Sequence, residues 1–317
     1  MNSTSSSAGT NLPIIPAIVG PTAIGKTSLA LELADRFALE IVSCDSRQLY
    51  KHMTIGTAKP TAEELAGRPY HLIDYVEPAE IYSAAKYRTA AEAAIADIRS
   101  RNRLPLVVGG TGLYLRALRQ GLFQTPDPDP VYRQELEQLS SSKLHKMLTE
   151  IDPQSAAATP PENRLRIIRA LEIHKLTGKT KFELAKSGDY PKLKYKFRLF
   201  GLTRYRQKLY QIINARVDKM VGDGLFDEVQ SLVEMGYGAS PALTSSIGYR
   251  EVLWHFSGEL SRRECVELIA QRHRNYAKRQ FTWFKKEPEL SEIDLDSESA
   301  LEILSSEIGK LKLDSQT

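Results

Sequence analysis

The chain has 317 residues, of which 42% are hydrophobic and 26% charged, with a formal net charge of +4. This composition is typical of a globular protein, and no apolar run approaches the roughly 18 residues of a membrane span, so we expect no membrane partner. The two cysteines, Cys44 and Cys265, provide no disulfide framework and predict a reducing, cytoplasmic location. Since the net charge is modest, a nucleic-acid partner must be argued from where the basic residues lie. Nothing in the sequence demands a dimer, and we expect a monomer.

The first 11 residues are rich in Ser and Thr and have no charged or apolar segment. They predict a disordered tail, and they do not resemble a secretory signal.

A phosphate-binding loop follows the first predicted strand. Residues 14–19 form a short apolar run, a glycine-bracketed loop covers 20–27, and a helical pattern begins at Ser28. In this context successive backbone N–H groups and the positive end of the helix bind anions, Lys26 adds a cation, and the Thr27 hydroxyl can bind Mg²⁺ or a phosphate oxygen. The alternative, a chance glycine-rich turn, does not explain all the fixed positions. The loop therefore predicts a diphosphate or triphosphate site, without saying whether a nucleotide carries it.

Two further strands complete the predicted site. Residues 39–43 form a strand that ends at Cys44 and Asp45, and a parallel crossover would place Asp45 beside the phosphate loop. Asp45 could instead cap a helix or hold Mg²⁺ through water. The third strand, 104–108, runs directly into the glycines of 109–114 and has no acidic residue at its end. Because nucleotide-hydrolysing proteins of this kind usually have such an acid, a simple ATPase or GTPase is disfavoured.

The remaining elements predict an α/β fold, a P-loop NTPase-like parallel sheet flanked by helices, with a small all-helical insertion. Residues 54–82 read as loops and turns, and 83–101 as a helix. Helical stretches at 131–150 and 162–177 lie in the insertion, which we place at 124–195. Strand character returns at 196–202 and helices at 204–235 and 259–285, so the core is predicted at 12–123 and 196–294. Residues 295–317 predict a surface tail with a fraying helix.

Basic residues gather near the end of the chain. Residues 271–286 contain six Lys or Arg, no acid and four aromatics, and Arg272, Tyr276, Arg279 and Trp283 share one helical face. Such a stripe suits phosphate neutralisation with nearby rings, although a solvated helix with core aromatics would look the same. Arg164, Arg166 and Arg169 form a second basic face, for which a solvated surface is the favoured interpretation.

Seven motifs in this order resemble the tRNA dimethylallyltransferases. They are GPTAIGKT at 20–27, DSRQLY at 45–50, GTAKP at 56–60, VGGTGLY at 108–114, RALE at 169–172, IGYR at 247–250 and KRQFTW at 278–283. The resemblance implies a Mg²⁺-dependent transfer of the dimethylallyl group from dimethylallyl diphosphate to N6 of adenosine 37, in tRNAs that read codons starting with U. It also explains the missing acid, because the loop would then hold the diphosphate of the prenyl donor and no nucleotide would be hydrolysed.

The resemblance implies roles for individual residues. Asp45 would be the base, with Thr111 and Lys26 as further catalytic residues, and Thr27 would bind the metal. The donor diphosphate would be held by Gly20, Pro21, Thr22, Ala23, Ile24, Gly25, Lys26, Thr27 and Arg216. Adenine must leave the anticodon stack to reach the donor, so contacts to the base and to the anticodon stem-loop are needed. The predicted tRNA contacts are Asp45, Ser46, Arg47, Gln48, Thr111, Arg133, Arg166, Arg169, Ser246, Ile247, Gly248, Tyr249, Arg250, Lys278, Arg279, Gln280 and Trp283.

Other functions remain open at this point. A nucleotide kinase would share the loop, Asp45 and an insertion, but would give the basic stripe no role. An RNA-binding switch would need the strand-end acid. An adenylate isopentenyltransferase, acting on free AMP, ADP or ATP, would not need the stripe or the full insertion.

Overall fold

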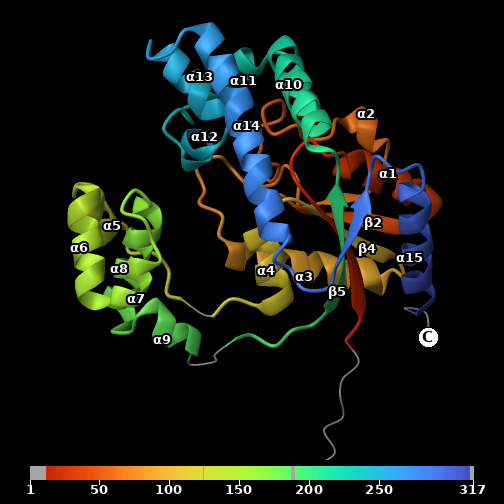
Figure 1. Cartoon of the computed structure of the whole chain (residues 1–317), viewed down its shortest axis with the longest axis horizontal. Coiled ribbons are helices and arrows are strands. Elements are labelled where there is room, and N and C mark those ends of the chain that lie inside the picture. Colours follow the sequence, from red (N-terminus) through yellow and green to blue (C-terminus); the bar gives the residue numbers. More distant parts are fainter. Residues whose placement is uncertain (1–11, 124, 187–189, 315–317) are drawn as a thin grey trace, which may run out of the picture. The chain divides into compact units, whose positions relative to one another are not determined.

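The computed structural model describes residues 12–123, 125–186 and 190–314 (Figure 1), so the predicted tail at 1–11 lies outside the described residues. The chain divides into two compact units. The core unit runs up to Gln120 and resumes at Leu193, and the helical unit is Gly121–Lys192. The insertion was predicted at 124–195, but residues 193–195 group with the core because they lead directly into a strand of the sheet.

The core contains a six-stranded parallel sheet in the order β3-β2-β4-β1-β5-β6. Its strands are β1 Ile14–Val19, β2 Leu39–Cys44, β3 Tyr70–His71, β4 Leu104–Gly109, β5 Lys196–Thr203 and β6 Leu290–Asp294. β2 and β4 are buried along their whole lengths, as expected for a parallel sheet covered on both faces. The predicted α/β class is confirmed, and the sequence did not predict β3 or β6.

The register brings three strand ends to one point at the edge of the sheet. Gly109, the last residue of β4, pairs with both Val19 and Cys44. A Cβ atom on Gly109 would lie 2.1 Å from the Cys44 carbonyl oxygen, so only glycine fits there. The phosphate loop after β1, the Asp45 loop after β2 and the glycine loop after β4 are therefore neighbours.

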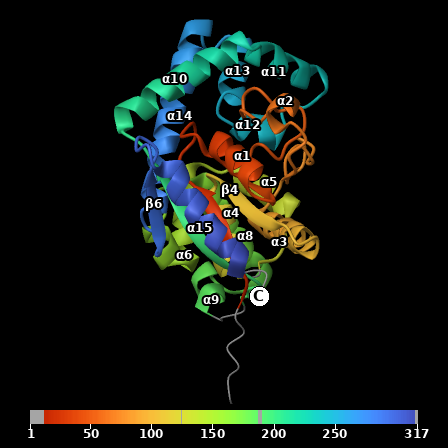
Figure 2. The same ribbon diagram turned by 90° about the vertical axis from the view of Figure 1, so that its right-hand side faces the viewer.

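Helices cover the sheet and also lie beyond the carboxyl ends of its strands (Figures 1 and 2). They are α1 Lys26–Arg36, α2 Ala62–Leu65, α3 Ala84–Ser100, α4 Gly112–Gln120, α10 Arg206–Gly222, α11 Leu225–Glu234, α12 Pro241–Ser245, α13 Tyr249–Phe256, α14 Arg262–Phe284 and α15 Ala300–Asp314. The helix predicted at 204–235 is split by Gly224, whose φ of 100° is left-handed. The long helix α14 begins with a capping box at Ser261 and Glu264, and it packs against α4, α10 and α13.

The end of the chain corrects the sequence prediction. Residues 295–317 were expected to form a fraying surface helix, but Leu304 and Ile308 of α15 are fully buried, with Ala300 beside them. These residues recur every four positions and form one face, which packs against α1 and β1. The helix is part of the core, and Figure 2 shows it next to α1.

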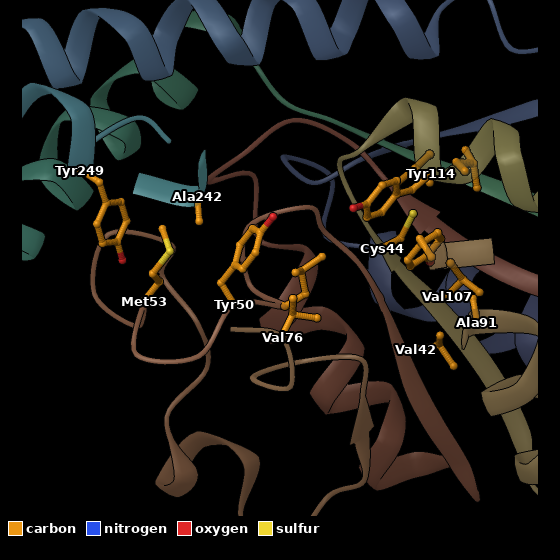
Figure 3. Close-up of a cluster of buried hydrophobic side chains, with 14 of the residues drawn as sticks. Val42, Cys44, Tyr50, Met53, Val76, Ala91, Val107, Tyr114, Ala242 and Tyr249 are labelled. Atoms are coloured by element: carbon orange, nitrogen blue, oxygen red, sulfur yellow. The ribbon is translucent and has the colours of Figure 1, made fainter. Parts of the chain in front are cut away.

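One hydrophobic cluster links the sheet to the helices near the site. It joins side chains of the sheet such as Val42 and Val107 to Met53, and through Met53 to Tyr249 of α13 (Figure 3). The rings of Tyr87 and Tyr114 stack at a centroid distance of 4.2 Å within the same cluster. The loop around Met53 is therefore anchored on both sides.

The helical unit has its own small core. Its helices are α5 Pro130–Glu137, α6 Ser141–Ile151, α7 Pro153–Ala157, α8 Arg164–Thr177 and α9 Lys181–Lys186. Leu144, Leu148 and Ile167 are fully buried between them. The helical stretch predicted at 131–150 is two helices, because Ser140 caps the start of α6. In the described ranges no helix has both the length and the apolar character needed to cross a membrane.

Candidate active site

A cleft of about 1120 Å³ opens where the carboxyl ends of the strands meet. Its walls come from the phosphate loop, the Asp45 loop, α10, the segment after α12 and α14. All of its lining residues belong to the core unit. Open parallel sheets bind ligands at this edge.

The phosphate loop has the backbone geometry that anion binding needs. Gly25 has φ 111° and directly precedes α1, whose first turn contains no acidic residue. Lys26 is half-buried, and its Nζ donates a hydrogen bond to the Pro21 carbonyl oxygen at 2.8 Å. Burial lowers the pKa of Lys26 to about 8, while nearby Asp45 partly opposes this shift.

Asp45 uses one of its two oxygens in the local turn. Oδ1 accepts hydrogen bonds from the backbone N–H groups of Arg47, at 2.8 Å, and Gln48, at 3.3 Å. No helix begins here, because residues 46–49 form a turn, so this oxygen closes a turn and does not cap a helix. Oδ2 has no hydrogen-bond partner among the described residues, and Asp45 lines the cleft. A carboxylate oxygen is thus left to accept a proton from a ligand.

Thr111 and Cys44 hold the Asp45 loop to the exit of β4. Thr111 Oγ1 accepts a hydrogen bond from the Ser46 N–H at 3.0 Å, and the Thr111 N–H donates to the Cys44 carbonyl at 3.1 Å. Thr111 is not among the residues that line the cleft. Burial raises the pKa of Cys44 to about 12, so its thiol is unreactive, as its expected place at a buried strand end implies.

Arg216 on α10 reaches the phosphate loop. Its Nη1 lies 3.5 Å from Thr22 Oγ1, and it lines the cleft. Burial lowers the pKa of Arg216, an effect that Asp45 opposes. Lys26 and Arg216 are therefore two cations that share one anion-binding site, which the sequence could connect only through the family resemblance.

Gln280 was predicted as a tRNA contact, but the structure gives its side chain another role. It is 6% exposed, its Oε1 accepts a hydrogen bond from the Thr22 N–H at 2.8 Å, and its Nε2 donates to the Gly110 carbonyl at 2.8 Å. Both ends of the amide are thus occupied. Gln280 joins the phosphate loop to the glycine loop after β4.

The predicted contacts at 246–249 are mostly internal. Tyr249 is fully buried, and its hydroxyl donates to Glu228 at 2.6 Å. Ser246 is 2% exposed and donates to the Ala242 carbonyl at 2.5 Å, while the Gly248 N–H donates to Glu251. This segment turns the chain into α13, and of the four residues Ser246 and Ile247 line the cleft.

Arg250 and Arg272 meet at one buried acid. Glu251 is fully buried and accepts hydrogen bonds from both guanidinium groups. Both cations also lie over the ring of Trp254, at 5.2 and 4.6 Å. Arg272, the first residue of the predicted stripe, therefore fixes α13 to α14.

The rest of the stripe is divided between two environments. Tyr276 and Arg279 line the cleft, with the guanidinium 5.5 Å from the Tyr276 ring. Trp283 lies against Gly112, where a Cβ atom would be 2.2 Å from its Nε1, and Arg116 covers its ring at 4.4 Å. Lys278 is exposed. Neither initial interpretation describes the whole stripe.

In the helical unit, two of the three predicted tRNA contacts have internal partners. Arg133 binds fully buried Glu172 through two hydrogen bonds, at 2.9 and 2.6 Å. Arg169 also pairs with Glu172 and donates to the Pro126 carbonyl. Arg166 is exposed. On the core unit, Arg47 donates to Ser245 Oγ at 3.0 Å.

Sequence reasoning missed three residues in or behind the cleft. Tyr70 lies beside Thr27 and Asp45, and burial raises its pKa. His273 lines the cleft with Nε2 buried and unpartnered, and burial lowers its pKa to about 4, so it is neutral at pH 7. Glu228 holds the turn at 54–56. None carries a local signal, because each acts through residues distant in sequence.

The cleft offers few protein ligands for a metal ion. Within the described ranges, no group of three or more His, Cys, Asp or Glu side chains could hold one. The Thr27 hydroxyl and the Asp45 carboxylate, both in the cleft, supply hard oxygen donors. This set fits Mg²⁺, which binds one or two protein oxygens together with substrate phosphates.

Comparison with known proteins shows which family the chain resembles. The sequence family described as IPP transferase matches residues 48–287. A tRNA dimethylallyltransferase of Myxococcus xanthus is 45% identical over 284 residues, which cover 88% of this chain and 92% of that protein.

Solved structures agree with the sequence matches. The structure of a tRNA isopentenylpyrophosphate transferase from Bacillus halodurans is 39% identical, with a TM-score of 0.70 over 96% of this chain and 98% of that one. A eukaryotic dimethylallyltransferase acting on tRNA has a TM-score of 0.76 at 28% identity, over 93% of this chain and 77% of that one. With the phosphate loop, the Asp45 loop and these matches in agreement, the chain is a member of the IPP transferase family.

Proposed function

We propose that this chain is a tRNA dimethylallyltransferase that moves the dimethylallyl group of dimethylallyl diphosphate to N6 of adenosine 37 in tRNAs reading codons that start with U. The observation that carries the proposal is the placing of an anion site, made by the phosphate loop, Lys26 and Arg216, beside the available oxygen of Asp45 in one cleft. We also expect a cytoplasmic location, as the two cysteines predict, and a monomer, because nothing in the sequence demands a dimer.

The cations and the loop amides would act on the leaving group. In the reaction the C1–O bond of the donor breaks and a C1–N6 bond forms, while negative charge grows on the departing diphosphate. Lys26, Arg216 and the residues at the start of α1 line the cleft together, and their N–H groups would surround that charge. Preorganised donors of this kind stabilise a transition state without reorganising during the reaction.

Asp45 would take the proton that N6 loses. An exocyclic adenine amine is a poor nucleophile because its lone pair is delocalised into the ring, so proton removal must accompany bond formation. Oδ1 is held by the Arg47 and Gln48 N–H groups, which fixes the carboxylate and leaves Oδ2 for the amine. A base fixed within hydrogen-bond reach typically contributes 10²–10⁴-fold in rate.

Mg²⁺, when bound, would neutralise charge on the diphosphate, and Thr27, which lines the cleft, is the residue that would hold it together with the phosphate oxygens. The adenine itself must enter the cleft from outside the anticodon stack. Tyr276 and Arg279, which line the cleft, provide a ring and a cation for the approaching nucleotide.

The test measures which acceptor receives the prenyl group. Labelled dimethylallyl diphosphate and Mg²⁺ are incubated with the protein and with an unmodified anticodon stem-loop bearing A36 and A37, or with AMP or ATP. We expect label in the stem-loop alone, and none in a matched stem-loop with G37. Label in free nucleotides would replace the proposal with adenylate prenylation, and phosphoryl transfer from ATP with no label in either acceptor would replace it with a kinase.

A further inference from the structure

Gln48 lines the cleft and is held by the loop that follows it. It is 8% exposed, and its Nε2 donates hydrogen bonds to the carbonyl oxygens of Thr57, at 3.3 Å, and Ala58, at 3.0 Å. Carbonyl oxygens only accept hydrogen bonds, so the amide can be oriented in one way. Both N–H bonds of Gln48 are used there, and its Oε1 is left as an acceptor.

Glu228 of α11 holds the same loop from behind. Its Oε2 accepts from the N–H groups of Thr54, at 2.8 Å, and Ile55, at 2.7 Å, and its Oε1 accepts from Gly56 at 3.1 Å. The Tyr249 hydroxyl completes the set at 2.6 Å. Hydrogen bonds to a charged acceptor are shorter and stronger than those between neutral groups. One carboxylate therefore fixes three successive peptide groups.

Tight packing adds to these bonds. A Cβ atom on Gly56 would lie 2.4 Å from a ring carbon of Tyr249, so the turn can approach the ring only as glycine. The Ala58 N–H bonds back to Ile55 and the Lys59 N–H to Thr54, which makes 54–59 a closed turn. The carbonyls of Thr57 and Ala58 are thus fixed relative to Glu228.

We propose that Glu228 is a positioning residue, which fixes the 54–58 turn so that Gln48 presents its Oε1 to the 6-amino group of the flipped base. This inference rests on the proposed function. The backbone N–H of Gln48 bonds to Asp45 Oδ1, so the two side chains leave the same turn and line the same cleft. With one amine N–H on Asp45 and the other on Gln48, the amine is gripped at both hydrogens. Both of these bonds lie in the plane of the base, so the nitrogen lone pair above that plane stays free for the donor carbon.

The arrangement selects a base by its 6-amino group. Two acceptors in the cleft favour the two N–H donors of adenine, and guanine offers an acceptor, its O6, at the same place. Glu228 contributes to this selection from outside the cleft, since it is not among the lining residues.

The test compares binding of two anticodon stem-loops without the donor, one with adenosine and one with purine riboside, which lacks the amino group, at position 37. The variant is Glu228→Gln. It replaces one carboxylate oxygen with an amide nitrogen, which cannot accept hydrogen bonds from the backbone N–H groups of the turn. The matched control is Glu234→Gln, an exposed change on the same helix. A second variant, Gln48→Met, removes the acceptor itself and keeps the test decisive if Glu228→Gln does not fold.

We expect the wild type and Glu234→Gln to prefer the adenosine stem-loop. One neutral hydrogen bond corresponds to roughly a threefold to tenfold difference in affinity, so Glu228→Gln and Gln48→Met should each lose about that much of the preference. Their affinity for the purine stem-loop should stay close to the wild-type value. If Glu228 had only a structural role, Glu228→Gln would bind both stem-loops more weakly by the same factor, and the inference would be overturned. An unchanged preference in Gln48→Met would also overturn it. If the wild type bound neither stem-loop and transferred no label, the proposed function would fail first.

Discussion

Gln280 shows how one side chain can support the phosphate loop from a helix that carries predicted RNA contacts. Its amide joins the Thr22 N–H to the Gly110 carbonyl, and both partners are backbone groups at the edge of the sheet. A buried polar group that loses its partner costs about 1–3 kcal/mol. The shape of the phosphate loop therefore depends on a residue 258 positions away.

We predict that Gln280→Met weakens donor binding at least tenfold and leaves stem-loop affinity nearly unchanged, because the two orphaned backbone groups lie at the phosphate loop. Calorimetry with dimethylallyl diphosphate and fluorescence anisotropy with the stem-loop measure the two affinities. Lys278→Met, an exposed change on the same helix, is the control and should show the opposite pattern. Loss of RNA affinity with intact donor binding in Gln280→Met would restore the tRNA-contact interpretation.

The lowered pKa of Lys26 predicts that donor affinity depends on pH. Burial lowers its pKa to about 8, so it is mostly protonated at pH 7 and mostly neutral at pH 9. The protonated form attracts the diphosphate, and donor affinity should therefore fall as the pH rises from 7 to 9, by about tenfold for one proton with this pKa. Lys26→Arg should bind more weakly but with a flat profile over this range. A flat profile in the wild type would contradict the prediction.

At the scale of elements, substitutions in α15 test whether the end of the chain belongs to the core. We predict that Leu304→Ala lowers the free energy of unfolding by about 2–5 kcal/mol, because it removes a fully buried side chain. Ile303→Ala, next to it but 45% exposed, should have a small effect. Urea denaturation of both variants measures the difference, and equally small effects would support a fraying surface helix.

The helical unit allows a similar contrast between two arginines. Arg133→Ala leaves fully buried Glu172 with fewer partners, so we expect a loss of roughly 1–3 kcal/mol in stability. Arg166→Ala changes an exposed residue and should leave stability unchanged while weakening stem-loop binding. Thermal unfolding and RNA binding separate the two. Weaker RNA binding by a fully stable Arg133→Ala would show that Arg133 contacts tRNA directly.

Local patterns were sufficient for part of this fold. The strands that carry the site are short, mostly apolar runs followed by glycine or a polar residue, so β1, β2 and β4 could be predicted together with the loops that follow them. β6 could not, because it has five residues of mixed burial and pairs only with β5 among the described strands. The apolar face of α15 could be seen in the sequence, but its polar neighbours favoured a surface helix.

The candidate site was likewise predictable only in part. Lys26 and Asp45 follow strands directly, so the topology alone brings them together. Gln280, Tyr249 and Arg133 were assigned to RNA contacts from the family resemblance, which matches a residue to the family but does not show what it contacts. Whether its side chain faces a ligand or the protein interior depends on residues far away in the sequence, such as Glu228 and Glu172.

At the scale of the whole molecule, the two units differ in what they hold. Every residue assigned to the donor lies in the core unit, whereas the predicted RNA contacts are divided between both. The core unit therefore contains all the groups that we assign to the chemical step. The central claim, that Asp45 acts as the base, therefore concerns one residue in one cleft.

The most direct test is the single-turnover transfer of labelled dimethylallyl to a stem-loop by Asp45→Asn, with the affinities for stem-loop and donor measured in parallel. Asparagine retains an oxygen for the Arg47 and Gln48 N–H groups, so the turn should persist. The account predicts a loss of roughly 10²–10⁴-fold in rate, a donor affinity within about threefold of the wild type, and a loss of stem-loop affinity of no more than about tenfold, the value of one hydrogen bond to the amine. A rate near that of the wild type, or a loss of rate matched by an equal loss of binding, would contradict the assignment of Asp45 as the base.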